Sequence, residues 1–248
     1  PAGRRSTLLK PPALNSFRVR TTGGQCGGCG NNCLITVKTF GDGQNFVTGN
    51  RCVKGAGEET TQPLAPNIYS YKYQRLFDYA PLAAKDAPRG AIGIPRVLNM
   101  YEDYPFWFTF FTALGYRVIL SAPSSRQLYV AGLDTIPAES ACLPAKMVHG
   151  HIKDLINKGV RKIFYPCIPR TPQEDPTADN CYNCPMVASY PEVIKANMDI
   201  CQQDGVLFYH PFLPMDNRDR LVTRLRQELK QENLAPYAIS KAVEKARA

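Results

Sequence analysis

Seven of the nine cysteines in this 248-residue chain fall into two groups whose positions suit metal binding. The first group has the spacing Cys-x2-Cys-x3-Cys, with a fourth cysteine further along the chain. The second group consists of three cysteines, each placed where a strand or helix is expected to end. Thiolates in such patterns bind zinc or iron–sulfur clusters. The first group is Cys26, Cys29, Cys33 and Cys52, and the second is Cys142, Cys167 and Cys184.

The composition indicates a soluble, folded chain. Hydrophobic residues make up 44% of it, which is enough for a core. No apolar run reaches the roughly 20 residues that a membrane-spanning helix needs. The first residues, Pro1 to Arg5, lack an initiator methionine and an apolar signal segment, so we expect a cytoplasmic chain that is a piece of a longer protein. Cysteines spaced as CxxC in a reducing cytosol favour thiolate–metal bonds over disulfides.

The formal net charge of +9 raises the question of nucleic-acid binding. The basic residues are dispersed, however, between a leader rich in proline and glycine and a C-terminal helix where acidic residues are interspersed. Such a distribution is typical of a solvated surface. We therefore expect no nucleic-acid partner, although a basic surface also suits an acidic protein or a polyphosphate such as coenzyme A.

Four segments are distinguished by their residue patterns. Residues 1–25 are predicted to be a linker, 26–57 a compact cysteine module, 58–89 a polar connector, and 90–248 an α/β domain. In the last segment short β-branched runs alternate with helical patterns, which is typical of a parallel sheet. We predict an open parallel sheet with flanking helices, preceded by a small cysteine-rich β-hairpin module.

The α/β segment contains four predicted strands and six predicted helices. The strands are 91–94, 117–120, 162–165 and 206–209, and the helices are 104–114, 124–130, 143–157, 191–199, 216–231 and 236–247.

The first cysteine group surrounds a predicted hairpin. Residues 34–40 and 45–48 are strand-like, and the Asp-Gly pair between them favours a two-residue turn. A turn at those two residues would place Cys33 opposite Cys52. The knuckle formed by Cys26 and Cys29 would then complete a four-sulfur site. Both structural zinc and an iron–sulfur cluster accept four thiolates, so the metal stays open.

The second cysteine group is expected to meet at one edge of the sheet. Cys142 begins the predicted helix 143–157, where the helix dipole stabilises a thiolate. Cys167 follows a predicted strand, and the carboxyl ends of parallel strands face the ligand crevice. Cys184 precedes another helix. Three cysteine ligands would leave one iron of a cubane cluster open to a further ligand.

Four other residues are weaker candidates. Lys146 and His149 share a helix face with Cys142 and could act on a substrate near the cluster, or they could simply be solvated. Cys181 is close enough in sequence to Cys184 to be an alternate ligand, whereas Cys201 is expected to be structural.

Several long motifs carry a resemblance to a known family. They are Ile94-Pro-Arg-Val-Leu-Asn-Met-Tyr-Glu-Asp-Tyr-Pro-Phe-Trp, Cys142-Leu-Pro-Ala-Lys-Met-Val-His-Gly-His, Phe164-Tyr-Pro-Cys167 and Asn183-Cys184-Pro. They resemble the activase-related proteins of the 2-hydroxyacyl-CoA dehydratase and benzoyl-CoA reductase group. The knuckle Cys26-Gly-Gly-Cys-Gly-Asn-Asn-Cys, with Gly49-Asn-Arg-Cys52, is similar to the segment that precedes this domain in those proteins.

The resemblance implies a Rossmann-like fold and an iron–sulfur cluster, expected to be 4Fe-4S, held by Cys142, Cys167 and Cys184. It also implies an ATP-hydrolysing activase as partner, as an upstream region or a separate protein. The chemistry of the family is the ATP-driven transfer of a low-potential electron to an acyl-CoA or another substrate that is hard to reduce.

Two functions from different classes therefore follow. The leading prediction is an iron–sulfur electron-transfer or reductase component of a 2-hydroxyacyl-CoA dehydratase-like system. The competing prediction is a non-catalytic, zinc-stabilised module for protein interaction. We also expect a homo-oligomer, and no membrane partner.

Overall fold

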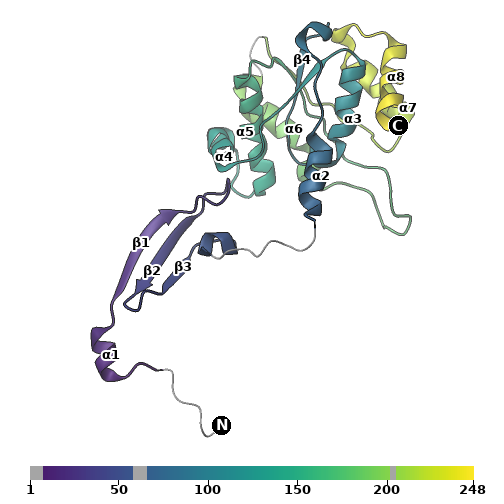
Figure 1. Cartoon of the computed structure of the whole chain (residues 1–248). Coiled ribbons are helices and arrows are strands. Elements are labelled where there is room, and N and C mark those ends of the chain that lie inside the picture. The colour runs from purple at the N-terminus through teal and green to yellow at the C-terminus, as the bar shows by residue number, and fades with distance from the viewer. Residues whose placement is uncertain (1–7, 58–65, 202–204) are drawn as a thin grey trace. The chain divides into compact units, whose positions relative to one another are not determined.

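The computed structural model describes residues 8–57, 66–201 and 205–248. The chain divides into two compact units, residues 1–66 and 67–248. The first contains a three-stranded antiparallel sheet, and the second a four-stranded parallel sheet flanked by helices (Figure 1). The predicted α/β class with a parallel sheet is confirmed for the second unit.

The hairpin of the first unit forms where it was predicted. Strand β2 (Leu34–Phe40) pairs with β3 (Asn45–Thr48). The loop between them spans residues 41–43, because the N–H of Phe40 donates to the carbonyl of Gln44 at 2.9 Å. Gly43 has a φ of 84°, the left-handed conformation that a three-residue hairpin loop requires at its last position. The loop is therefore one residue longer than the predicted turn.

This longer loop changes the register of the hairpin. Thr36 faces Thr48, and the ladder does not place Cys33 opposite Cys52. Strand β3 ends at Thr48, and Cys52 lies beyond it as the residue before the 3₁₀ helix η1 (Val53–Ala56). The predicted pairing of these two cysteines was wrong because a shift of one residue changes every facing pair of a ladder.

The segment predicted as a linker, 1–25, contains a helix and a strand in its described part. Helix α1 (Pro11–Ser16) is followed by β1 (Val19–Gln25), which pairs antiparallel with β2. Every residue of β1 is exposed, so no alternation of apolar residues marks it in the sequence. Its conformation comes from backbone pairing with β2. Residues 1–7, and residues 58–65 of the predicted connector, lie outside the described residues.

The sheet of the second unit has the strand order β5-β4-β6-β7. The strands are β4 (Ala91–Ile94), β5 (Arg117–Leu120), β6 (Lys162–Phe164) and β7 (Leu207–Tyr209), each within one residue of its prediction. The chain passes from β4 to β5 on one side and then crosses back to β6 on the other. In open α/β sheets ligands bind at such a reversal, outside the carboxyl ends of the strands.

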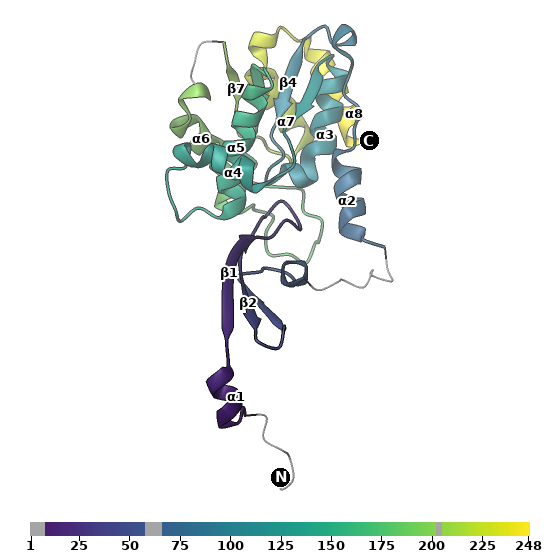
Figure 2. The same cartoon turned by 60° about the vertical axis from the view of Figure 1, so that its left-hand side comes forward.

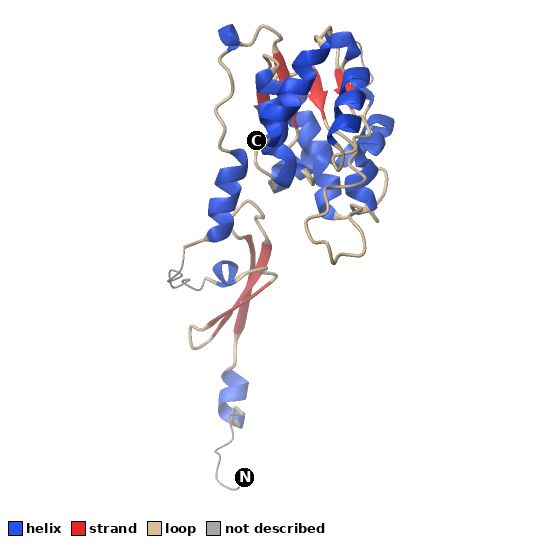
Figure 3. Ribbon diagram, turned by 90° about the vertical axis from the view of Figure 1, so that its right-hand side faces the viewer, coloured by secondary structure: helices blue, strands red, loops and turns tan. Residues whose placement is uncertain are grey.

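Helices cover both faces of this sheet (Figure 2; Figure 3). Helix α3 (Met100–Ala113) lies on one face together with α8 (Pro236–Arg247), while α2 (Ile68–Phe77) packs against α3 and α7 (Arg218–Glu228) against α8. The opposite face carries α4 (Arg126–Gly132), α5 (Leu143–Asn157) and α6 (Pro185–Asn197). The helices divide between the two faces because crossovers between parallel strands are right-handed. The connection from β4 to β5 and the connection from β5 to β6 run in opposite directions along the sheet, so their helices lie on opposite faces.

Helix α5 has the predicted bounds, but α3 and α6 begin earlier than predicted. Helix α6 begins at Pro185 and carries Pro191 inside it, and α3 begins at Met100 and carries Pro105 inside it. Both differences have one cause. Proline favours the first turn of a helix, so an internal proline resembles a helix start in the sequence.

The core of the second unit is rich in aromatic side chains. Trp107, Phe110 and Phe111 of α3 are fully buried, and the ring of Phe164 packs against Trp107 and Phe111. These contacts hold α3 against the sheet. None of the helices in the described part of the chain has the length and apolar character needed to cross a membrane.

Candidate functional site

The three cysteines of the second group lie at the carboxyl edge of the parallel sheet. Cys142 and Cys184 are the N-cap residues of α5 and α6, and a proline follows each within the first turn. Cys167 lies just beyond β6 and forms a parallel bridge with Phe212, which lies just beyond β7. Helices that connect parallel strands begin near the edge where those strands end. The topology therefore brings three thiol-bearing connections to one edge.

Cys167 projects toward the layer of α5 and α6. The backbone stays extended beyond β6, because the N–H groups of Tyr165 and Cys167 both donate to the neighbouring chain at 2.9 Å. Side chains two residues apart in an extended segment point to the same face. Phe164, one residue before Tyr165, packs against α3 on the other face. Tyr165 and Cys167 thus face the helices that begin at the other two cysteines.

The three thiols differ in exposure. Cys142 and Cys184 are exposed, whereas Cys167 is fully buried. Burial raises the pKa of the Cys167 thiol to about 12, and the charge of Glu192 raises it further, while a hydrogen bond from the backbone of Glu192 opposes the shift. Cys167 is therefore a neutral thiol in the metal-free protein, and metal binding there would release a proton.

Two tyrosine hydroxyls lie near these thiols. Tyr165 is fully buried, and its hydroxyl has no hydrogen-bond partner among the described residues. Burial raises the pKa of Tyr165 well above its ordinary value, and negative charge at Cys167, Tyr190 and Cys184 adds to the effect. Burial also raises the pKa of Tyr190, to which the charge of Cys142 contributes. Together the two hydroxyls are within electrostatic range of all three thiols.

A chain of hydrogen bonds orients Tyr190. The hydroxyl of Thr135 donates to the carbonyl of Gly132 at 3.0 Å and lies 2.8 Å from Nδ1 of His149. Because the Thr135 proton is used, Nδ1 of His149 carries the hydrogen and Nε2 is the acceptor. The Tyr190 hydroxyl lies 3.1 Å from this Nε2 and donates to it. Only the lone pairs of the Tyr190 oxygen remain for other groups.

The two candidate catalytic residues of α5 have different surroundings. His149 is fully buried, and burial lowers its pKa to about 4, with the charge of Lys153 contributing, so the ring is neutral at pH 7. Both of its ring nitrogens are occupied, which makes His149 a positioning residue for Tyr190 in this structure. Lys146 is half-buried and has no hydrogen bond or ion pair with any described residue. A catalytic role for Lys146 stays a prediction.

No three His, Cys, Asp or Glu side chains within residues 8–57, 66–201 and 205–248 lie close enough together to hold a metal ion. A four-iron cluster is wider than a single ion, and its cysteine ligands stand further apart. The donors at the sheet edge fit such a cluster in kind, because they are thiols and an unpartnered buried hydroxyl lies near them. A ligand set of Cys142, Cys167 and Cys184 stays a prediction.

Two cysteines of the first group, Cys26 and Cys33, lie side by side at one end of the antiparallel sheet. Cys26 and Cys33 extend the ladder of β1 and β2, and the N–H of Cys26 donates to the carbonyl of Cys33 at 2.8 Å. A Cβ atom added at Gly55 would lie 3.6 Å from Sγ of Cys26. Gly55 belongs to η1, the helix that follows Cys52. The backbone of Cys26 therefore pairs with Cys33, and the thiol of Cys26 points toward the turn that follows Cys52. Cys29 is exposed.

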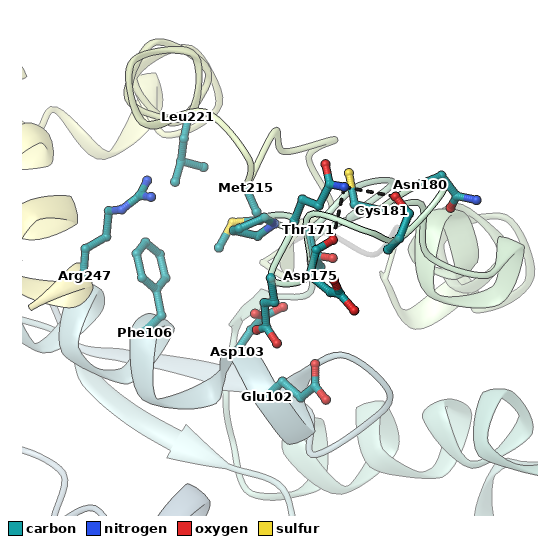
Figure 4. A pocket seen from close by; sticks show the side chains of 14 residues that line it. Glu102, Asp103, Phe106, Thr171, Asp175, Asn180, Cys181, Met215, Leu221 and Arg247 are labelled. Carbon is teal, nitrogen blue, oxygen red and sulfur yellow. Dashed lines mark hydrogen bonds between the residues drawn. The ribbon is translucent and has the colours of Figure 1, made fainter.

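A pocket that the sequence analysis missed lies between the start of α3 and the loop after β6 (Figure 4). Its volume is about 480 Å³, within the range of ligand pockets. Burial raises the pKa of Asp103 in its wall to about 6, with the charge of Glu102 adding to the shift and a hydrogen bond from Asn99 opposing it. Its walls come from segments far apart in the chain, so no local sequence pattern predicts this pocket. They include Glu102, Asp103, Phe106, Asp175, Cys181 and Arg247.

The two remaining cysteines have other surroundings. Cys181, the predicted alternate ligand, lines the pocket of Figure 4, and Nη2 of Arg170 donates to its sulfur at 3.3 Å. Cys201 is buried within the hydrophobic core, and burial raises the pKa of its thiol to about 12. All nine cysteines of the chain are free thiols.

A comparison with protein families identifies the second unit. The model described as "CoA enzyme activase uncharacterised domain (DUF2229)" matches residues 91–248. This region contains the whole parallel sheet and the second cysteine group. Comparison with curated proteins and with solved structures found no match. Because the family model covers more than half of the chain, this protein belongs to the CoA enzyme activase-related family that the sequence motifs resembled.

Proposed function

We propose that this chain is the iron–sulfur electron-transfer component of an ATP-dependent system related to the 2-hydroxyacyl-CoA dehydratases. Membership of the activase-related family supports the link to an ATP-dependent activase partner. The observation that carries the proposal is the placement of Cys142, Cys167 and Cys184 on three connections at the carboxyl edge of one sheet. A cluster bound there would accept and pass on low-potential electrons.

The environment of each thiol suits its proposed task. Cys142 and Cys184 each begin a helix of more than ten residues, so both thiols lie at the positive end of a helix dipole. Cys167 comes from the buried side of the edge, where the surroundings exclude water. Two exposed thiols and one buried thiol would leave one side of a cluster open for electron entry and for substrate.

An acyl-CoA is the substrate class that we favour, because of a basic groove close to Cys167. This groove of about 600 Å³ includes three arginines, Arg170, Arg220 and Arg224, and the exposed ring of Phe212. Two carboxylates, Asp216 and Asp219, also line it, and Asp216 pairs with Arg170 at 3.8 Å. Arg220 has no ion-pair partner among the described residues, and guanidinium groups bind phosphates well. The pocket of Figure 4 suits phosphates less, because the only arginine among its described lining residues is Arg247, and the carboxylates that line it are Glu102, Asp103, Glu174 and Asp175.

Iron, acid-labile sulfide and zinc analysis of protein purified without oxygen tests the proposal. We expect roughly four iron and four sulfide per chain for the second group, the composition of a cubane cluster. The first group would add either zinc or further iron and sulfide. About one zinc per chain, with no sulfide and no visible absorption, would instead support the zinc-stabilised interaction module.

Substitution of single cysteines then locates the cluster. Cys142→Ala, Cys167→Ala and Cys184→Ala should each remove the same iron and sulfide and leave the metal of the first group in place. Cys181→Ala is the matched control, because it lies three residues from Cys184 but lines another pocket. Unequal or absent losses among the three variants would refute a shared site.

A further inference from the structure

Tyr165 has a hydroxyl whose hydrogen bond is missing. The side chain is fully buried, and the hydroxyl has no partner among the described residues. A buried polar group without a partner is destabilising, so native proteins rarely retain one without a reason. Phenylalanine would fill the same space at no such cost. We therefore expect the Tyr165 hydroxyl to donate a hydrogen bond to a bound ligand.

The direction of the Tyr165 side chain indicates where this ligand lies. Tyr165 and Cys167 project from the same face of the extended segment after β6, toward α5 and α6. The hydroxyl is within electrostatic range of Cys167 and Cys184. The ligand that would accept the proton of Tyr165 is therefore expected on the side of the sheet where these two cysteines lie.

The neighbouring Tyr190 cannot supply the same hydrogen bond. Its proton is committed to Nε2 of His149, because Nδ1 of that ring donates to Thr135. Tyr165 is thus the hydroxyl of this pair that has a proton to give.

We propose that Tyr165 is the hydrogen-bond donor of the thiol-lined site, and that its hydroxyl donates to a sulfur atom of the cluster or of its cysteine ligands when the cluster is bound. This inference rests on the proposed function, since it needs a cluster at Cys142, Cys167 and Cys184. Tyr165 is a positioning and tuning residue, and it exchanges no electrons itself.

A donor beside the cluster sulfurs has a predictable effect on the reduction potential. Reduction adds negative charge to the cluster, and a hydrogen bond to sulfur stabilises the reduced form more than the oxidised form. Tyr165→Phe removes the donor and keeps the ring. The midpoint potential of the variant should therefore be more negative than that of the wild type.

The experiment uses the full chain, reconstituted without oxygen with ferrous iron and sulfide. Redox titration followed by visible absorption and electron paramagnetic resonance gives the midpoint potential. Tyr190→Phe is the control within the site, and its potential should stay near the wild-type value because the Tyr190 proton is used by His149. Tyr104→Phe is a control elsewhere in the core, where a buried tyrosine makes no hydrogen bond with any described residue.

The metal-free protein provides a second readout that needs no cluster. Since the Tyr165 hydroxyl lacks a partner there, Tyr165→Phe should melt at the wild-type temperature or above it. After reconstitution the order should reverse, because the wild type gains a hydrogen bond that the variant cannot make. A variant that melts well below the wild type without metal would show that the hydroxyl already has a partner, and would overturn the inference.

The possible outcomes separate the inference from the proposed function. A wild-type protein with iron and sulfide, and a Tyr165→Phe variant with an unchanged potential, would overturn the inference and leave the function standing. An equal shift in Tyr190→Phe would also overturn it. A wild-type protein that binds no iron and sulfide would overturn both.

Discussion

Two glycines determine how closely α4 and α5 approach each other. A Cβ atom added at Gly150 of α5 would lie 1.8 Å from the carbonyl oxygen of Leu128 in α4, and one added at Gly132 would lie 2.4 Å from the backbone nitrogen of Gly150. Both contacts are with backbone atoms, which cannot rotate away. This close approach positions the helix that begins at Cys142 and contains His149.

Gly150→Ala should therefore destabilise the second unit by about 2–3 kcal/mol, because overpacking outweighs the gain of about 1 kcal/mol in helix propensity. Urea unfolding followed by circular dichroism measures the change. Asn157→Ala, at an exposed position of the same helix, is the control and should change stability by less than about 0.5 kcal/mol. A neutral Gly150→Ala variant would mean that α4 and α5 are not held in this contact.

The carboxylate of Glu232 joins the connection between α7 and α8 to the parallel sheet by hydrogen bonds. Glu232 ends the short helix η5 (Lys230–Glu232) and accepts hydrogen bonds from Tyr116 and Lys162, each at 2.6 Å, and from Tyr209. Burial by itself would raise the pKa of Glu232, but the three hydrogen bonds outweigh it and hold the pKa below its ordinary value. Glu232 thus connects the C-terminal helices to three strands, because Tyr116 directly precedes β5, Lys162 begins β6 and Tyr209 ends β7.

Loss of this carboxylate should detach the C-terminal helices from the sheet edge. Glu232→Ala leaves a partly buried lysine and two hydroxyls without their acceptor, and we expect a cost of about 3 kcal/mol. Glu228→Ala is the matched control, because it removes a partly exposed ion pair with Arg224 within α7 and should cost less than about 1 kcal/mol. Equal midpoints of thermal unfolding for the two variants would contradict the assigned role of Glu232.

Two buried histidines and one half-buried carboxyl of the second unit change its stability between pH 6.5 and 5. Burial lowers the pKa values of His149 and His151 to about 4, and raises that of Asp103 to about 6. The unfolded chain binds protons at both histidines below pH 6.5, so folding loses stability there as the pH falls. Asp103 acts in the opposite sense, because the folded chain holds its proton up to pH 6 and the unfolded chain releases it near pH 3.8.

With two histidines against one carboxyl, the net effect is a loss of stability on acidification. We expect about 1.4 kcal/mol per pH unit between pH 6 and 5, measured by urea unfolding at each pH. Asp103→Asn should make the loss steeper, and His151→Asn should make it shallower. Stability that rises toward pH 5 would show that the two histidines are not buried in their neutral forms.

Features that depend on residues close together in the sequence were predictable from the sequence alone. The four strands of the parallel sheet, the bounds of α5 and the position of Cys142 at the start of α5 follow from short apolar runs and helical periodicity. The motifs that run through these elements also indicated the family, which the match to residues 91–248 confirmed.

Features that join distant segments required the folded chain. One extra residue in the loop before Gln44 shifts the register of β2 and β3, so that Cys33 is not opposite Cys52. Strand β1, which pairs with the other side of β2, places Cys26 beside Cys33. The partners of His149 and the orphan hydroxyl of Tyr165 depend on how helices pack over the sheet. Local patterns report the conformational preference of a segment, but contacts across the fold depend on register and packing, to which every segment contributes.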